Sequence, residues 1–126
     1  MVSINKNSSK PYYEQLMLSI KEDILNGLLQ PGDRLPSVRE MARLLLMNPN
    51  TVSKAYKLLE SQEVIVTVKG KGTYVKKIDT ELRDEFKIQK LKKDFNDLVI
   101  EANYLNVSIE EMSQWLNDSY RHLKGE

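Results

Sequence analysis

The chain has 126 residues, a net charge of +1 and no cysteine. The length suits one domain, or one domain with an appendage. The lack of cysteine excludes disulfides and thiolate metal sites. No apolar signal core begins the chain and no apolar run is long enough to cross a bilayer, so we expect a cytoplasmic protein without a membrane partner.

The charges are unevenly distributed along the chain. Residues 1–77 hold twelve Lys or Arg against seven Asp or Glu, whereas residues 78–126 hold seven against eleven. A basic first part favours contact with a polyanion, and an acidic second part does not. Chance can also produce an imbalance of this size.

A first helix is predicted from about residue 10 to Gly27. Pro11 suits the first turn, because its missing N–H would have no partner there. Gly27 is a natural stop just past the end. Apolar side chains recur on one face between them, at Tyr13, Leu16, Met17, Ile20 and Ile24.

Two shorter helices follow, each with its own start signal. Ser37 and Glu40 have the spacing of a capping box, with helical apolar spacing after them. Asn48-Pro49-Asn50 breaks the pattern, and we expect Asn50 to cap a third helix over residues 51–62. Two helices joined by so short a turn have the layout of a helix-turn-helix, a module that reads the major groove of DNA.

Residues 64–75 predict a β-hairpin, because two β-branched runs flank a glycine-containing loop at Lys69–Gly72. Helix, helix-turn-helix and hairpin is the order of a winged helix. The loop has three interpretations: a solvated turn, a phosphate cradle, or a wing tip close to nucleic acid. The Walker spacing is absent, so nucleotide hydrolysis is unsupported. We favour the wing tip because of where the loop lies.

The last part of the chain predicts two amphipathic helices. A heptad-like stripe runs from Leu91 to Leu105, and Ser108 with Glu111 forms another capping box. Two such helices cannot easily bury their own apolar faces, so they must pack on the winged helix or on a second copy. The candidate dimerisation residues are Leu91, Phe95, Leu98, Ala102, Leu105, Met112, Trp115 and Leu116.

Three segments taken together resemble the GntR family of bacterial transcription regulators: residues 31–42, 48–56 and 71–75. The short two-helix tail resembles the YtrA-like branch of that family. The resemblance covers roughly residues 10–77. It implies a winged helix that binds a palindromic operator as a dimer.

The resemblance also implies which residues meet DNA. The arginine of the Leu-Pro-x-x-Arg motif, the start of the third helix and the wing tip are the family's contacts. Relatives often carry arginine where this chain has Pro49, Ser53 and Lys69. The candidate DNA-binding residues are Arg39, Asn48, Pro49, Asn50, Thr51, Ser53, Lys54, Lys57, Lys69, Gly70, Lys71 and Gly72.

Several of these residues have a second interpretation. Arg39 could form an ordinary ion pair with Glu40 or Asp33. Asn50 could serve as a helix cap rather than as a base reader. Tyr56 lies at an inner-face position, where a tyrosine is more often part of the core than a contact.

The fold expected is mainly α with a small β-hairpin. It comprises a winged helix-turn-helix over residues 10–77 and a helical dimerisation tail over residues 78–126. We expect a dimeric, sequence-specific regulator of transcription that acts as a repressor. Its expected partners are an operator in double-stranded DNA and a second copy of the chain. The alternative is a winged helix that binds protein.

An enzyme is not expected. His122 is the single histidine, and no nucleophile–base set or carboxylate pair has support in the sequence. We therefore assign no catalytic residue, no metal ligand and no cofactor, and the sequence identifies no small-molecule effector.

Overall fold

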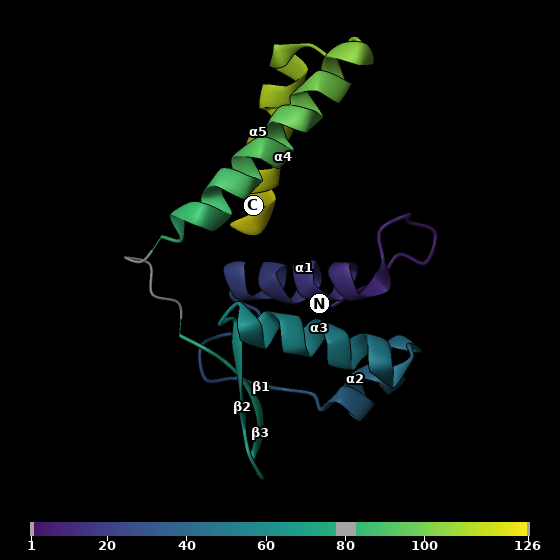
Figure 1. Cartoon of the computed structure of the whole chain (residues 1–126), viewed down its shortest axis with the longest axis vertical. Coiled ribbons are helices and arrows are strands. Elements are labelled where there is room, and N and C mark those ends of the chain that lie inside the picture. The colour runs from purple at the N-terminus through teal and green to yellow at the C-terminus, as the bar shows by residue number, and fades with distance from the viewer. Residues whose placement is uncertain (1, 78–82, 126) are drawn as a thin grey trace. The chain divides into compact units, whose positions relative to one another are not determined.

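The chain folds into two compact units, residues 1–78 and 79–126. A computed structural model describes residues 2–77 and 83–125 (Figure 1). The boundary that the sequence suggests after residue 77 borders residues 78–82, which lie outside the described residues.

The first unit is a winged helix-turn-helix, as predicted. Three helices precede the wing, and a short strand lies between the first two. The elements are α1 (Tyr12–Leu25), β1 (Arg34–Leu35), α2 (Val38–Leu45), α3 (Pro49–Ser61), β2 (Ile65–Val68) and β3 (Gly72–Val75).

The core lies where the three helices meet the sheet. The largest fully buried side chains come from α1, α3 and β2, and they are Leu16, Ile20, Val52, Leu59 and Ile65. Burying an aliphatic side chain of this size stabilises a fold by roughly 1.5–3 kcal/mol. The inner face of α3 is thus fixed by the core, which leaves its opposite face free.

The sheet has three antiparallel strands in the order β1-β3-β2, so the predicted hairpin gains a strand on one side. In the added pairing Arg34 lies opposite Tyr74, and Leu35 opposite Thr73. The sequence did not predict β1. A strand of two residues has no periodicity of its own, and its partner lies about forty residues further along the chain.

The helix starts agree with the sequence at α2 and differ at α3. The Ser37 hydroxyl accepts from the Glu40 N–H at 3.1 Å, and a Glu40 carboxylate oxygen accepts from the Ser37 N–H at 3.3 Å. The expected cap at Asn50 is wrong. Asn48 caps α3, and its side-chain oxygen accepts from the Asn50 N–H at 2.8 Å. Pro49 at the first helical position sets this start, because proline suits that position and no later one.

The turn between α2 and α3 contains a strained residue. Leu46 ends α2 with a φ of +53°, in the left-handed region that a side chain other than glycine's seldom adopts. Its side chain is 80% exposed, so little packing compensates for the strain. The next residue, Met47, returns to the core.

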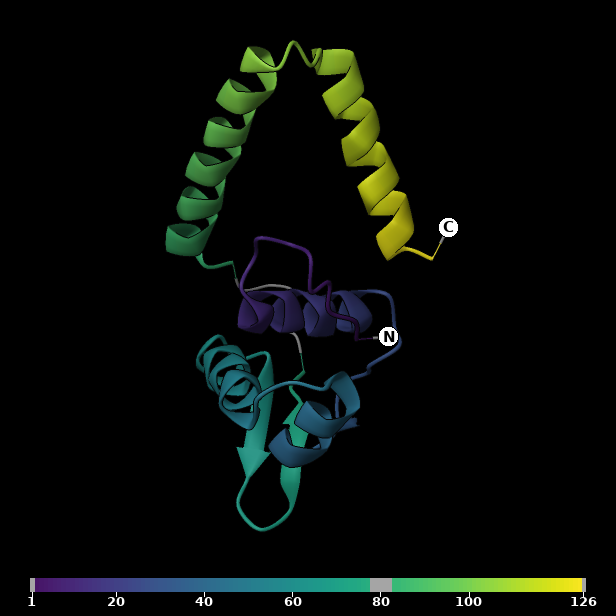
Figure 2. The same ribbon diagram turned by 90° about the vertical axis from the view of Figure 1, so that its right-hand side faces the viewer.

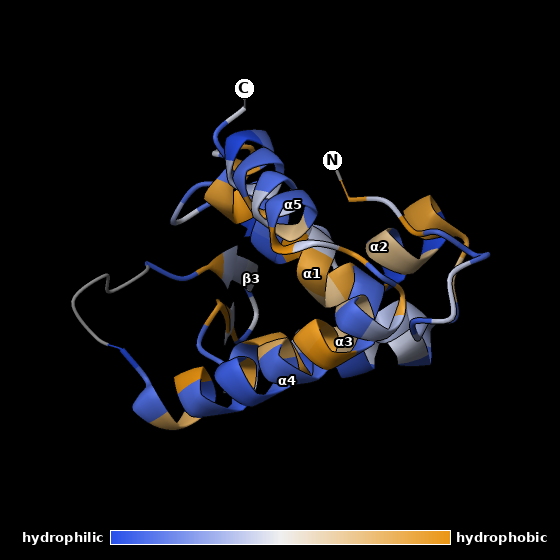
Figure 3. Cartoon of the chain, turned by 90° about the horizontal axis from the view of Figure 1, so that it is seen from above, coloured by the Kyte–Doolittle hydropathy of each residue, from blue (hydrophilic) through white to orange (hydrophobic). Residues whose placement is uncertain are grey.

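The second unit consists of α4 (Glu85–Tyr104) and α5 (Ile109–Leu123), which diverge from the turn that joins them (Figure 2). Side chains cap both helix starts, at Asp84 and Ser108. Polar and apolar bands alternate along α4 (Figure 3). None of the helices within residues 2–77 and 83–125 has the length and hydropathy of a transmembrane segment.

The strain at Leu46 leads to a stability prediction. Leu46→Gly removes the steric conflict of the left-handed backbone and should raise the free energy of unfolding by about 0.5–1 kcal/mol. Leu44→Gly is the matched control, because Leu44 is similarly exposed but lies inside α2. That control should lower stability by about 1 kcal/mol. Urea unfolding measures both, and a destabilised Leu46→Gly variant would contradict the strain.

Candidate nucleic-acid interface

Arg39 projects from the first turns of α2 and is exposed. Neither Glu40 nor Asp33 forms the ion pair with Arg39 that the sequence left open. Glu40 is engaged in the capping box, and a carboxylate oxygen of Asp33 accepts from the Gln30 N–H at 2.8 Å. Across residues 2–77 and 83–125, Arg39 has no hydrogen bond or ion pair. Its five N–H donors are therefore available to an anion.

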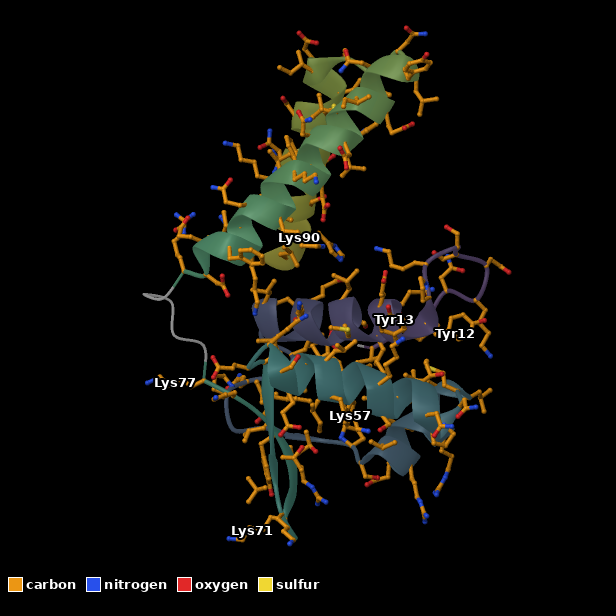
Figure 4. All side chains as sticks on the ribbon, viewed as in Figure 1. Tyr12, Tyr13, Lys57, Lys71, Lys77 and Lys90 are labelled. Atoms are coloured by element: carbon orange, nitrogen blue, oxygen red, sulfur yellow. The ribbon has the colours of Figure 1, made fainter. Side chains whose placement is uncertain are left out.

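The outer face of α3 carries the predicted readers. Asn50 is exposed, and Thr51 and Ser53 are partly exposed. Because Asn48 supplies the cap, the Asn50 side chain is not used for capping, and its amide is available to a base edge. Lys57 also projects from α3 (Figure 4).

Lys54 has a contact that the sequence did not predict. Its ammonium lies over the ring of Tyr13, 4.0 Å from the centroid, in a cation–π arrangement between α3 and α1. The contact limits the directions in which Lys54 can reach. Lys54 and Lys57 therefore lie in different environments, although both were candidates for DNA contact.

Tyr56 belongs to the core, as expected. Its hydroxyl donates to the Pro36 carbonyl oxygen at 2.7 Å, which joins α3 to the residues just before α2. Burial, with a smaller effect from the charge of Glu40, raises the pKa of Tyr56 above its ordinary value. The hydroxyl thus keeps its proton and remains a donor at physiological pH.

The wing tip is a tight loop held by its own backbone and one side chain. The Lys71 N–H donates to the Val68 carbonyl at 2.9 Å, and the Tyr74 hydroxyl donates to the Lys71 carbonyl at 3.1 Å. Gly70 has a φ of +77°, which favours glycine there. The Lys69 side chain is exposed, and Lys71 lies at the tip of the hairpin (Figure 4).

Two further arginines lie near these groups, and the sequence analysis missed both. Arg43 follows Arg39 by one turn on α2, so the spacing of four residues could have identified it. Arg34 is on β1, and no local pattern pointed to it. Both affect Glu40: hydrogen bonds with Ser37 lower the pKa of Glu40, and the charges of Arg34 and Arg43 lower it further.

The twelve candidate residues therefore share one property: each is exposed or partly exposed, and none is in the core. They come from α2, α3 and the wing of one compact unit. In the described part of the chain no three His, Asp or Glu side chains are grouped so that they could hold a metal ion.

Comparison with known proteins decides the family. The model of the bacterial regulatory proteins of the gntR family matches residues 12–75. The transcriptional repressor YtrA of Bacillus subtilis is 42% identical over 125 residues, which cover 99% of this chain and 96% of the relative. The chain belongs to the gntR family. It is therefore a DNA-binding regulator of transcription, and not an enzyme.

Solved structures agree with this assignment. A transcriptional antiterminator from Listeria monocytogenes EGD-e has a TM-score of 0.93 at 40% identity, covering 100% of this chain and 94% of that one. The DNA-binding domain of AraR, in complex with an operator, has a TM-score of 0.51 at 27% identity. The alignment covers 60% of this chain and 94% of AraR's domain, so the gntR-family fold is shared with a protein seen on DNA.

The capping correction leads to a prediction that separates stability from recognition. Asn48→Ala removes the cap of α3 and should lower the free energy of unfolding by about 1 kcal/mol. Asn50→Ala removes no hydrogen bond of the folded chain, so its stability should change by less than about 0.5 kcal/mol. Thermal unfolding of the two variants tests this. Greater destabilisation by Asn50→Ala would restore Asn50 as the cap.

Proposed function

We propose that this gntR-family protein is a dimeric repressor that binds a palindromic operator. The observation that supports a dimer is the exposed apolar surface of the tail. The large apolar side chains that are 52% to 87% exposed on α4, α5 and their turn are Phe86, Leu91, Phe95, Leu98, Ile100, Tyr104, Leu105, Ile109, Trp115, Leu116 and Tyr120.

Such a surface favours a second protein chain over water. Soluble monomers seldom expose apolar patches larger than a few hundred Å², and larger ones mark interaction sites. Among the candidate dimerisation residues, Met112 is partly exposed and Ala102 is buried. The other six are more than half exposed. A second tail with the same stripes is the complementary partner that we propose.

On the DNA side, we assign affinity and sequence preference to different groups. Lysines and arginines neutralise phosphates and supply most of the affinity. The start of α3, with Asn50, Thr51 and Ser53, supplies base contacts in the major groove, and the wing tip reaches the minor groove. Arg39, which has five free donors, can make a bidentate contact with guanine, about 1–3 kcal/mol of discrimination.

Symmetry follows from the dimer. Two winged helices related by a two-fold axis would bind half-sites about one helical turn apart (~10 bp), or a multiple of it. The tail then sets the half-site spacing without touching bases. The repressing role is proposed from the function that the name of the Bacillus subtilis relative YtrA states.

The salt dependence of binding reports how many phosphates the protein neutralises. Binding of DNA through several phosphates weakens with a log–log slope near −0.9 per phosphate neutralised. The slope measured for the wild type is therefore the reference for every variant below.

Arg39→Ala tests the DNA assignment. The variant should bind a duplex selected from a random pool at least tenfold more weakly, because it loses a contact that no other side chain replaces. The fold should be unchanged, since Arg39 is exposed. Arg121→Ala, in the acidic tail, is the matched control and should bind normally. Equal affinity of wild type and Arg39→Ala in a gel-shift titration would overturn the role of Arg39.

The dimer is tested by charge introduced into the stripe of α4. Leu91→Glu with Leu98→Glu places carboxylates within the proposed interface and should give a monomer in sedimentation. Asn96→Glu lies on the same helix outside the stripe and should leave the oligomeric state unchanged. A dimer that survives the double substitution would contradict the role of the tail. If the double variant is a monomer as expected, DNA selected by it from a random pool should contain single half-sites.

A further inference from the structure

Arg34 lies against the base of the wing. A Cβ atom built on Gly72 would lie 2.8 Å from the Arg34 Nε and 3.5 Å from its Cζ and Nη2. Gly72 itself has no such atom, so the guanidinium can lie across its backbone. A side chain of any other residue at position 72 would displace it.

The backbone of Arg34 is held firmly while its side chain is exposed. Arg34 pairs with Tyr74 in the sheet, and the Val75 N–H donates to the Asp33 carbonyl at 2.8 Å. The next residue, Leu35, is in the core. An arginine mounted in this way loses little further backbone freedom when it binds a ligand.

The guanidinium has no partner in the described residues: neither a hydrogen bond nor an ion pair engages it. The nearby carboxylate is Glu40, which is already engaged by Ser37. The Arg34 guanidinium thus lies beside Gly72 of the wing, and its charge acts on Glu40, the neighbour of Arg39 in the first turn of α2. Both Gly72 and Arg39 belong to the proposed DNA-binding surface.

We propose that Arg34 binds a backbone phosphate of the operator, beside the stretch contacted by the wing. The inference rests on the proposed function, because a duplex bound by the wing passes close to the guanidinium beside Gly72. A planar fork of N–H donors suits the bidentate geometry of phosphate. Because Gly72 has no side chain, it leaves the space that the Arg34 guanidinium occupies.

A phosphate contact has a signature that a base contact lacks. Arg34→Gln keeps a side chain that can hydrogen-bond but removes the charge. It should weaken binding about tenfold for a selected duplex and by the same factor for a scrambled duplex. The log–log salt slope should become shallower by about 0.9. Arg34→Lys should restore the slope while recovering only part of the affinity.

The controls separate this contact from a structural effect. The thermal midpoint of Arg34→Gln should equal that of the wild type, since the side chain is exposed. Arg121→Gln removes an arginine of the tail and should change neither affinity nor slope.

Three results would overturn the inference. If Arg34→Gln binds DNA with the affinity and salt slope of the wild type, Arg34 makes no phosphate contact, but the proposed function is unaffected. A loss confined to the selected duplex would make Arg34 a base reader. A wild-type chain that binds neither duplex with a salt-dependent affinity would refute the proposed function, and the contact with it.

Discussion

One partly buried hydrogen bond, from the Tyr56 hydroxyl to the Pro36 carbonyl oxygen, joins the two helices of the helix-turn-helix. Pro36 precedes the cap of α2, and Tyr56 lies in the middle of α3. The bond therefore fixes the start of one helix against the centre of the next. Leaving either polar group buried and unpaired would cost about 1–3 kcal/mol, so alternative packings of the two helices are disfavoured.

Local signals in the sequence predicted most of the first unit. The Ser37 capping box, the stop at Gly27 and the wing glycines depend only on residues a few positions apart, and all appear in the structure. The two failures have different causes. β1 depends on pairing with a distant strand, which no local pattern reveals. At α3 two asparagines flank a proline, and only the fixed φ of Pro49 selects Asn48 as the cap.

For the candidate DNA-binding residues, the sequence predicted which side chains are accessible but not which contacts they make. Every residue that the sequence nominated for DNA contact is exposed or partly exposed, because family motifs and helix periodicity both locate the outer face. The sequence could not predict which groups these side chains contact in the folded chain. Neither the contact of Lys54 with Tyr13 nor that of Arg34 with Gly72 follows from spacing, since each joins elements far apart along the chain.

The selectivity of the proposed dimer for its operator depends on both the DNA-contacting residues and the tail. No arginine lies on α3, so guanine contacts from this helix come only from shorter side chains such as Asn50 and Ser53. The arginines of the first unit lie instead on α2 and β1: Arg39 is the proposed guanine reader, whereas the phosphate contact proposed for Arg34 adds affinity without reading sequence. A single half-site is then only modestly selective, since each wrong base pair costs about 1–3 kcal/mol. In the proposed dimer, two half-sites at a spacing set by the tail would multiply that selectivity. The apolar stripe of α4 is thus as necessary to operator choice in the proposed dimer as the recognition helix.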